Sequence, residues 1–157
     1  MCHLNILKMN KQILKDTIQR LFSGNKGLLA MDESTGNCNK RFATAGIPQT
    51  IEMRRKYCEL MLTTPGLNES IDGDILYDET IRQQTTAHVP IAEVLEKAGI
   101  IPGIKVDMGA KPMVGFTIEK VTEGFDGSRE RLAEYKKIGA RFGKKLLTNP
   151  GVLVLWK

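Results

Sequence analysis

This 157-residue sequence is poor in cysteine, histidine and tryptophan, and it contains no long apolar run. Its three cysteines, Cys2, Cys38 and Cys58, fit neither a disulfide framework nor a zinc site, so we expect free thiols in a reducing compartment. Neither His3 nor His88 has another histidine or a cysteine at the spacing of metal ligands. The sequence therefore gives no reason to expect a metal site or a cofactor.

No stretch approaches the roughly 20 apolar residues that a membrane-spanning helix needs. The first residues lack the apolar run of a signal peptide, so we expect a cytoplasmic protein. No glycine-rich dinucleotide fingerprint follows an apolar run. The segment 139–145 is only faintly similar to a phosphate-binding loop, because its spacing is too short and its final serine or threonine is missing. These absences argue against membrane, secreted and nucleotide-binding classes.

The composition, with 41% hydrophobic and 26% charged residues, is that of an ordinary soluble globular domain. The net charge of +5 suits an anionic small-molecule substrate, and it would also suit weak binding to a nucleic acid. The basic residues are spread along the chain, apart from Lys136–Lys137 and Lys144–Lys145. A dedicated nucleic-acid surface would cluster them, so no nucleic-acid partner is expected.

Helical and strand-like segments alternate along the chain. Helices are expected over Met9–Phe22, 51–63, Pro90–Ala98 and Ser128–Leu146, and strands over Leu28–Met31, Ile75–Tyr77 and Ile100–Val106, with the tail Val152–Trp156 as one more candidate. A long loop fills 107–127. The alternation predicts an α/β fold with a parallel sheet. Functional residues in such folds gather at the carboxyl ends of strands, where Asp32, Asp78 and Asp107 lie.

Two charged residues stand next to apolar strand-like runs. Asp32 follows Leu28–Met31, and Lys105 lies inside Gly103–Asp107. Burying a charge is costly unless it is paired, so one interpretation turns both side chains toward the axis of a closed parallel sheet. With Asp107, they could there bind a phosphorylated substrate. The other interpretation makes Asp32 a helix or turn cap and Lys105 a solvent-facing residue of an edge strand.

Several of these residues belong to segments that carry a family likeness. In chain order they are Gly27–Gly36 (GLLAMDESTG), Lys40–Arg41, Arg54–Arg55, Leu76–Thr80 (LYDET), Gly103–Asp107 (GIKVD), Gly124–Gly127 (GFDG) and Tyr135–Phe142 (YKKIGARF). Together they resemble class I fructose-bisphosphate aldolase, the Schiff-base type, over residues 10–144. Several motifs at compatible spacing are far more specific than any one of them alone.

The resemblance implies a (β/α)8 barrel, of which this chain would form the first three to four βα units. Residues 1–26 would be an N-terminal helix and lead-in, 27–144 the N-terminal half of the barrel, and 145–157 a divergent tail. A complete barrel of this type needs about 250 residues. An open half-barrel would leave sheet edges and an apolar inner face uncovered, which favours self-association and makes a homo-oligomer an expectation.

The resemblance also implies a function. The family cleaves fructose 1,6-bisphosphate into dihydroxyacetone phosphate and glyceraldehyde 3-phosphate in glycolysis, using an imine on a lysine and no metal. The residues that match its site are Asp32 and Lys105 as catalytic residues, Ser34, Lys40, Arg41 and Arg54 near the substrate phosphates and hydroxyls, and Glu33 and Asp107 as supporting residues. Asn37 stands where the family has a further serine.

The chain departs from the family after Lys144. The family continues into a fourth strand that ends in another lysine, whereas Lys157 comes several residues too late to take that role. The imine-forming lysine and the catalytic glutamates belong to later strands, so we expect this chain by itself to be inactive. The alternatives are a non-catalytic module that binds sugar phosphates or self-associates, and an unrelated open α/β domain with a chance likeness.

Overall fold

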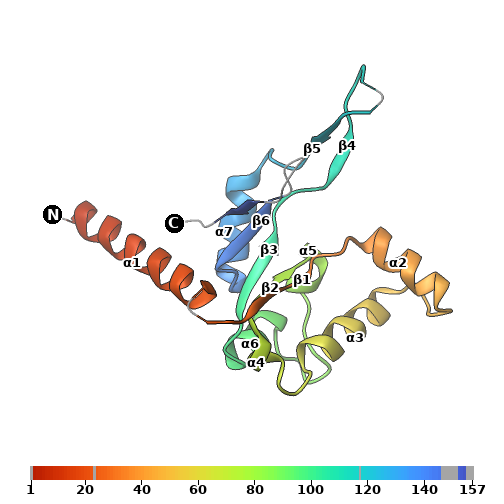
Figure 1. Cartoon of the computed structure of the whole chain (residues 1–157), viewed down its shortest axis with the longest axis horizontal. Coiled ribbons are helices and arrows are strands. Elements are labelled where there is room, and N and C mark those ends of the chain that lie inside the picture. Colours follow the sequence, from red (N-terminus) through yellow and green to blue (C-terminus); the bar gives the residue numbers. More distant parts are fainter. Residues whose placement is uncertain (1, 23, 117, 146–151, 155–157) are drawn as a thin grey trace.

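The computed structural model describes residues 2–22, 24–116, 118–145 and 152–154 (Figure 1). The helices are α1 (Cys2–Phe22), α2 (Thr35–Thr44), α3 (Ile51–Leu62), α4 (Leu67–Ser70), α5 (Asp78–Ile81), α6 (Ile91–Lys97) and α7 (Ser128–Ile138). The strands are β1 (Gly27–Met31), β2 (Ile71–Leu76), β3 (Ile101–Lys105), β4 (Ala110–Pro112), β5 (Lys120–Thr122), β6 (Phe142–Lys145) and β7 (Val152–Val154).

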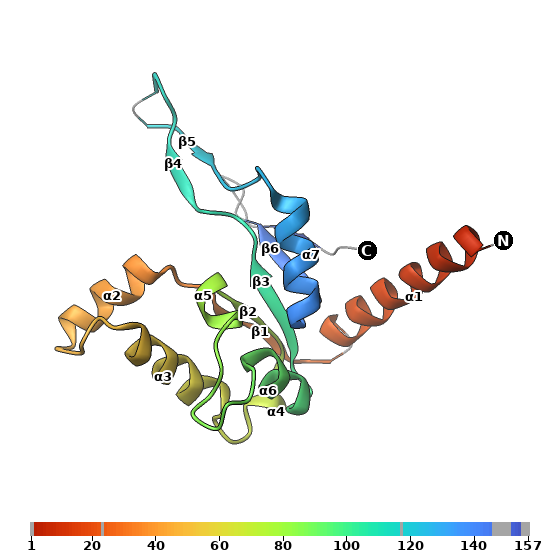
Figure 2. The same ribbon diagram turned by 180° about the vertical axis from the view of Figure 1, so that it is seen from behind.

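The main sheet has the strand order β1-β2-β3-β6-β7. Strands β1, β2, β3 and β6 are parallel neighbours in chain order, and β7 pairs antiparallel with β6. Strands β4 and β5 form a separate antiparallel hairpin that projects from the sheet (Figures 1 and 2). Parallel strands joined in order by helical crossovers are the connection of a (β/α)8 barrel, so the predicted fold class, a partial barrel of this type, is confirmed.

Apolar side chains cover both faces of the sheet. On one face a cluster that includes Leu76 and Ile104 packs against Leu95 of α6. Ile75, which is adjacent to Leu76 and therefore points the other way, belongs to a second cluster with Leu21 and Phe142. A parallel sheet that is buried on both faces reads as near-continuous apolar runs, and this is why β3 and the end of β2 can be predicted from the sequence.

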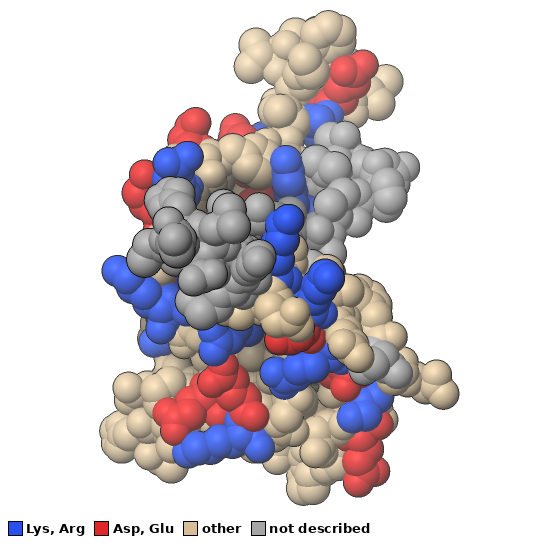
Figure 3. All heavy atoms as spheres, turned by 90° about the vertical axis from the view of Figure 1, so that its left-hand side faces the viewer, with Lys and Arg blue, Asp and Glu red and all other residues tan. Residues whose placement is uncertain are grey.

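The surface of the molecule carries both signs of charge. On the face shown in Figure 3, Lys and Arg side chains lie beside Asp and Glu side chains. Lys26 and Asp72, at 3.5 Å, are one of the ion pairs that join opposite charges. Among the described residues, no helix combines the length and the apolar character that crossing a membrane requires.

Several predicted elements are confirmed. Strand β1, helix α6 and strand β3 lie where the pattern placed them. Helix α3 begins after Thr50, whose side-chain oxygen accepts a hydrogen bond from the Met53 N–H at 3.2 Å, as an N-cap does. Two elements begin earlier than expected, since α1 extends back to Cys2 and β2 to Ile71.

The prediction of one helix over Ser128–Leu146 is wrong. Helix α7 ends at Ile138, and Gly139 follows with φ 126°, a backbone conformation that an L side chain rarely adopts. The chain then reverses into β6, which supplies the fourth parallel strand. The fourth strand therefore lies before the tail.

The remaining differences concern short elements. The loop expected over 107–127 contains the β4–β5 hairpin, and helices α2, α4 and α5 were not expected. In the tail, Val152–Val154 forms β7, as the apolar run predicted, whereas 155–157, including Lys157, lie outside the described residues.

Candidate active site

A cavity of about 690 Å³ opens at the carboxyl ends of β1, β2 and β3. Asp32, Asp78 and Asp107, each one or two residues beyond a strand, all line it, as a parallel sheet requires. Its other polar walls are Glu33, Ser34, Asn37, Tyr77, Arg82, Lys105, Lys111, Arg131 and Tyr135. The cavity is therefore rich in both carboxylates and cations.

Lys105 and Asp107 form an ion pair inside this cavity. Asp107 Oδ1 accepts from Lys105 Nζ and, at 2.9 Å, from the backbone N–H of Gly109. The Lys105 side chain is 14% exposed and that of Asp107 is fully buried. Pairing and hydrogen bonding offset the cost of burying both charges, which explains how charged residues fit beside an apolar strand.

Asp32 pairs with Lys144 rather than with Lys105. Lys144 Nζ lies 2.8 Å from Asp32 Oδ2, and the two side chains are 31% and 11% exposed. Lys144 on β6 is the register partner of Lys105 on β3, so the two lysines occupy neighbouring positions on one face of the sheet. Asp32 and Lys105 both line the larger cavity, and each has a separate partner.

Lys144 was missed because its segment was predicted to be helical. The signal that could have found it is Gly139, a residue typical of the end of a helix, followed by Phe142, an aromatic residue favoured in strands, just before a lysine pair. With the helix ended at Gly139, Lys144 becomes a strand residue that can face Asp32.

A second charged group connects α5 with α7 at the rim. Arg82 binds Asp78 at 2.8 Å and also pairs with Glu134, while the Tyr135 hydroxyl donates to Asp78 Oδ1 at 2.9 Å. Burial, followed by the hydrogen bond to Asp78, raises the pKa of Tyr135 to about 12. Tyr135 therefore keeps its proton at neutral pH and acts as a donor that holds the Asp78 carboxylate in place.

Lys111 on β4 was also missed by sequence reasoning. Among the basic side chains that line this cavity, within the described part of the chain, it alone has neither an ion pair nor a side-chain hydrogen bond. It is therefore the cation in the cavity with no protein partner to give up when it meets an anion.

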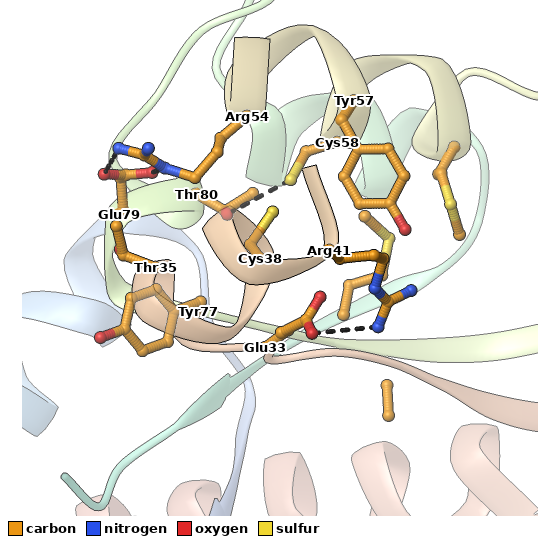
Figure 4. Close-up of a pocket in the computed structure, with 13 residues that line it drawn as sticks. Glu33, Thr35, Cys38, Arg41, Arg54, Tyr57, Cys58, Tyr77, Glu79 and Thr80 are labelled. Atoms are coloured by element: carbon orange, nitrogen blue, oxygen red, sulfur yellow. Dashed lines mark hydrogen bonds and ion pairs between the residues drawn. The ribbon is translucent and has the colours of Figure 1, made fainter. Parts of the chain in front are cut away.

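Three residues that the resemblance placed near substrate phosphates do not line this cavity. Lys40 is exposed on α2, and Arg41 pairs with Glu33 at 3.0 Å. Arg54 binds Glu79 with two hydrogen bonds of 2.7 and 2.8 Å. Arg41 and Arg54 line a separate cavity between α2 and α3 (Figure 4), whereas Ser34 and Asn37 do line the larger one.

Neither cavity presents an obvious metal centre. Within the described ranges, no group of three or more histidine, cysteine, aspartate or glutamate side chains is placed to hold a metal ion. The chemistry that the larger cavity offers is that of paired ammonium and carboxylate groups: binding of anions and transfer of protons.

Parallel strands in chain order, with charged residues gathered at their carboxyl ends, define the chain as part of an α/β-barrel enzyme. The family model described as "Glycolytic: Fructose-bisphosphate aldolase class-I" matches residues 13–147. The chain therefore belongs to the class I fructose-bisphosphate aldolase family.

Individual relatives agree with this assignment. The chain is 54% identical over 136 residues to a probable fructose-bisphosphate aldolase class 1 of Xanthomonas axonopodis pv. citri (strain 306), and 44% identical over 131 residues to fructose-bisphosphate aldolase 3, chloroplastic, of Arabidopsis thaliana. These matches cover 87% and 83% of this chain but 41% and 34% of the relatives. The chain thus spans less than half the length of these relatives.

A solved structure shows the same arrangement. Fructose-bisphosphate aldolase from Plasmodium falciparum, in complex with TRAP and a small molecule inhibitor, superposes with a TM-score of 0.81 and 44% sequence identity. The match covers 85% of this chain and 39% of that chain. The fold described above is therefore that of the corresponding part of an aldolase.

Proposed function

We propose that this chain forms the N-terminal half of a class I aldolase barrel and contributes its cavity to the cleavage of fructose 1,6-bisphosphate. The products would be dihydroxyacetone phosphate and glyceraldehyde 3-phosphate. The observation that carries the proposal is a cavity lined by Asp32, Lys105 and Asp107, in which Asp107 pairs with Lys105, while Asp32 pairs with Lys144 of the neighbouring strand β6. A cytoplasmic location and the division at residues 26/27 and 144/145 belong to the same proposal.

The cations of the cavity suit a substrate with two phosphate groups. Lys105, with Lys111 on the neighbouring wall, brings ammonium groups to an anion in a partly buried space. Charge-assisted hydrogen bonds to phosphate are among the stronger polar contacts in proteins, and partial exclusion of water strengthens them further. We assign the binding of substrate oxygens to these lysines, with Ser34 and Asn37 contributing neutral hydrogen bonds from the β1 side.

Asp32 has the geometry for proton handling. Carbon–carbon cleavage of a β-hydroxy imine needs a group that removes the hydroxyl proton while the bonding electrons move toward the imine. By resemblance the imine lysine belongs to a later strand of the family's barrel. Asp32, paired with Lys144 at 2.8 Å at the carboxyl end of β1, would hold Lys144 in position and exchange that proton. Glu33 and Asp107 would support this arrangement.

The phosphate-binding roles of Lys40, Arg41 and Arg54 remain predictions from the resemblance. Their side chains lie outside the larger cavity, and Arg41 and Arg54 already have carboxylate partners. Binding of the substrate through these residues would require exchange of those partners. Among the residues matched as substrate-binding, Ser34 is the one that the cavity geometry supports.

Substrate binding by the purified 157-residue chain tests the proposal. Isothermal titration with fructose 1,6-bisphosphate should give saturable binding, weakened about tenfold or more by Lys105→Met, because a charge-assisted contact is lost. Lys97→Met is the matched control, since Lys97 lies on α6, 68% exposed, and pairs with Glu93 at 2.8 Å. Equal affinities of the two variants, or no binding by the unmodified chain, would refute the proposal.

A further inference from the structure

A cavity of about 190 Å³ lies between α2, α3, α5 and the end of β1, and the proposed aldolase chemistry does not use it (Figure 4). It is separate from the larger cavity, although Glu33 and Tyr77 line both. Its walls come from several different elements between residues 30 and 80, so their packing against one another forms it.

The interior of this cavity is lined by sulfur and aromatic side chains. Cys38 of α2 and Cys58 of α3 face it, together with the ring of Tyr57 and the thioethers of Met31 and Met61. Burial raises the pKa of both thiols, so they remain neutral at neutral pH. Thioether and thiol groups are soft and polarizable, and they make favourable contacts with aromatic rings.

The charged groups on the walls are already neutralised. Arg54 binds Glu79 through two hydrogen bonds, and Arg41 binds Glu33 at 3.0 Å, with both pairs visible in Figure 4. A charged ligand would have to break one of these pairs, whereas a neutral ligand would leave both intact. The walls therefore favour an uncharged occupant.

The size of the cavity limits that occupant to one ring. An apolar cavity of about 150 Å³ is enough to hold benzene. A volume of about 190 Å³ therefore accommodates a single ring with one small substituent.

We propose that this cavity is a second ligand site, selective for an uncharged single-ring aromatic molecule, which the two cysteine thiols and the Tyr57 ring contact. The site is distinct from the sugar-phosphate cavity and shares a wall with it. The proposal does not depend on the aldolase function, because binding of the ring is measured without turnover.

Saturation-transfer NMR of the 157-residue chain with phenol as the probe tests the site. Phenol should give a saturable signal, and cyclohexanol, similar in size but not aromatic, should bind more weakly. Cys58→Phe, which fills the cavity, should abolish the phenol signal. Leu60→Phe is the matched control, because Leu60 lies on the same helix, 71% exposed and outside the cavity lining. Equal phenol binding by these variants, or equal binding of cyclohexanol, would overturn the proposal.

Protection of the two thiols from alkylation by bound phenol provides a second measurement. It tests the site in the unmodified chain if circular dichroism shows that Cys58→Phe does not fold. Alkylation of Cys38 and Cys58 by iodoacetamide, followed by peptide mass spectrometry, should slow about tenfold when phenol is present at roughly ten times its dissociation constant. Glutathione in the same tube should react at an unchanged rate. Equal alkylation rates with and without phenol would contradict the proposed aromatic site. Competitive displacement of phenol by fructose 1,6-bisphosphate would contradict its separation from the larger cavity.

Discussion

Asp74 brings a carboxylate into the packed layer between the sheet and the helices. It lies on β2, paired in register with Leu29 of β1 and Pro102 of β3, and it shares a sheet face with Leu76. Its side chain is fully buried, and neither carboxylate oxygen accepts a hydrogen bond of good geometry, although the backbone N–H groups of Met31 and Ile75 offset part of the rise in its pKa. Burial, with a smaller contribution from the charge of Asp32, raises the pKa of Asp74 to about 7. An unpaired buried carboxylate of this kind destabilises the folded chain.

Replacing Asp74 by valine should therefore stabilise the protein. The raised pKa means that Asp74 binds its proton more tightly in the folded state than in the unfolded state. As pH rises from about 4 to about 7, this carboxyl therefore progressively lowers the free energy of unfolding. Asp74→Val should raise the free energy of unfolding by a few kcal/mol at pH 8 and by less at pH 5. Urea denaturation of both proteins across this pH range gives the difference.

Asp72→Val provides the matched control for this experiment. Asp72 lies two residues earlier on β2, and its carboxylate faces Lys26 at 3.5 Å. Its replacement should lower the free energy of unfolding by less than about 1 kcal/mol. Because Asp74 is still present, the change in stability between pH 5 and pH 8 should be the same in Asp72→Val as in the unmodified protein. A loss of stability in Asp74→Val at pH 8 would show that the carboxylate has partners that stabilise it.

Arg54 is expected to stabilise the fold of this chain. Its guanidinium binds both oxygens of Glu79 and, at 2.9 Å, the side chain of Asn39, which connects α3 to α5 and α2. Arg54→Ala leaves the partly buried Glu79 without its partner, so the free energy of unfolding should fall by about 3 kcal/mol. Arg54→Lys should recover little of this loss, because lysine cannot bind both oxygens of Glu79 as arginine does. Thermal and urea denaturation measure the loss.

The paired control for Arg54 is Arg41→Ala. Arg41 is 63% exposed, so loss of its contact with Glu33 should have little effect on stability. If the two alanine variants proved equally stable, and Arg54→Ala instead weakened binding of fructose 1,6-bisphosphate, the phosphate-binding role given by the resemblance would hold.

Strand β6 shows why apolar periodicity alone does not reveal the fourth strand. Tyr135 and Phe142 are separated by two helical turns, so the apolar spacing of α7 continues smoothly past the true helix end. Both residues are buried, but Tyr135 packs in the cluster with the helices and Phe142 in the cluster with Leu21 on the other face. Gly139, whose φ is 126°, separates them, and local periodicity carries no information about which face a residue will meet.

Helix α2 was missed for a different reason. Its sequence contains Gly36, Asn37 and Asn39, which are poor helix formers, and only Cys38 and Phe42 are buried. Contacts with the rest of the protein, such as the edge-to-face packing of Phe42 on Tyr57, stabilise it where its own propensity is weak. Helix α3, by contrast, has an N-cap and a clear apolar stripe, and it was predicted almost to the residue.

The packing of β3 on β6 gives a sharp test of this strand assignment. A Cβ added at Gly103 would overlap three ring atoms of Phe142. Gly103→Ala should therefore destabilise the protein by about 1–3 kcal/mol, and Phe142→Leu in the same chain should recover part of the loss. Urea denaturation of the single and double variants measures the coupling between the two positions.

Gly27→Ala on β1 serves as the control, because nothing lies within 4 Å of a Cβ at that position. It should change stability by less than about 0.5 kcal/mol. If Gly103→Ala were as mild as Gly27→Ala, residues 142–145 would not lie against β3 as described.

The candidate site could be predicted only where strand ends define it. Asp32, Lys105 and Asp107 follow from the rule that parallel strands carry functional residues at their carboxyl ends, and all three line the cavity. Lys111 comes from a hairpin with three-residue strands, too short to give a pattern. The partner of each charge could not be predicted either, because the Asp32–Lys144 contact depends on the register between strands far apart in sequence.

The number and direction of the strands in the main sheet bear on whether the isolated chain can cleave a substrate. The main sheet contains four parallel strands and one antiparallel strand, β7, where a closed barrel has eight parallel strands. The two lysines at its centre, Lys105 and Lys144, are both engaged by carboxylates. Imine formation requires an amine free to attack a carbonyl, and neither lysine is presented in that way.

The purified 157-residue chain should therefore bind fructose 1,6-bisphosphate without cleaving it. Incubation with dihydroxyacetone phosphate and borohydride should leave the intact mass unchanged, while fructose-bisphosphate aldolase 3 of Arabidopsis thaliana, treated in parallel, checks the reagents. Borohydride reduces an imine to a stable amine, so even a rare adduct would accumulate and could be located by peptide mass spectrometry. An adduct on Lys105 or Lys144 would show that one of these ion pairs opens to release a nucleophilic amine, and the non-covalent roles proposed for Lys105 and Lys144 would then be wrong.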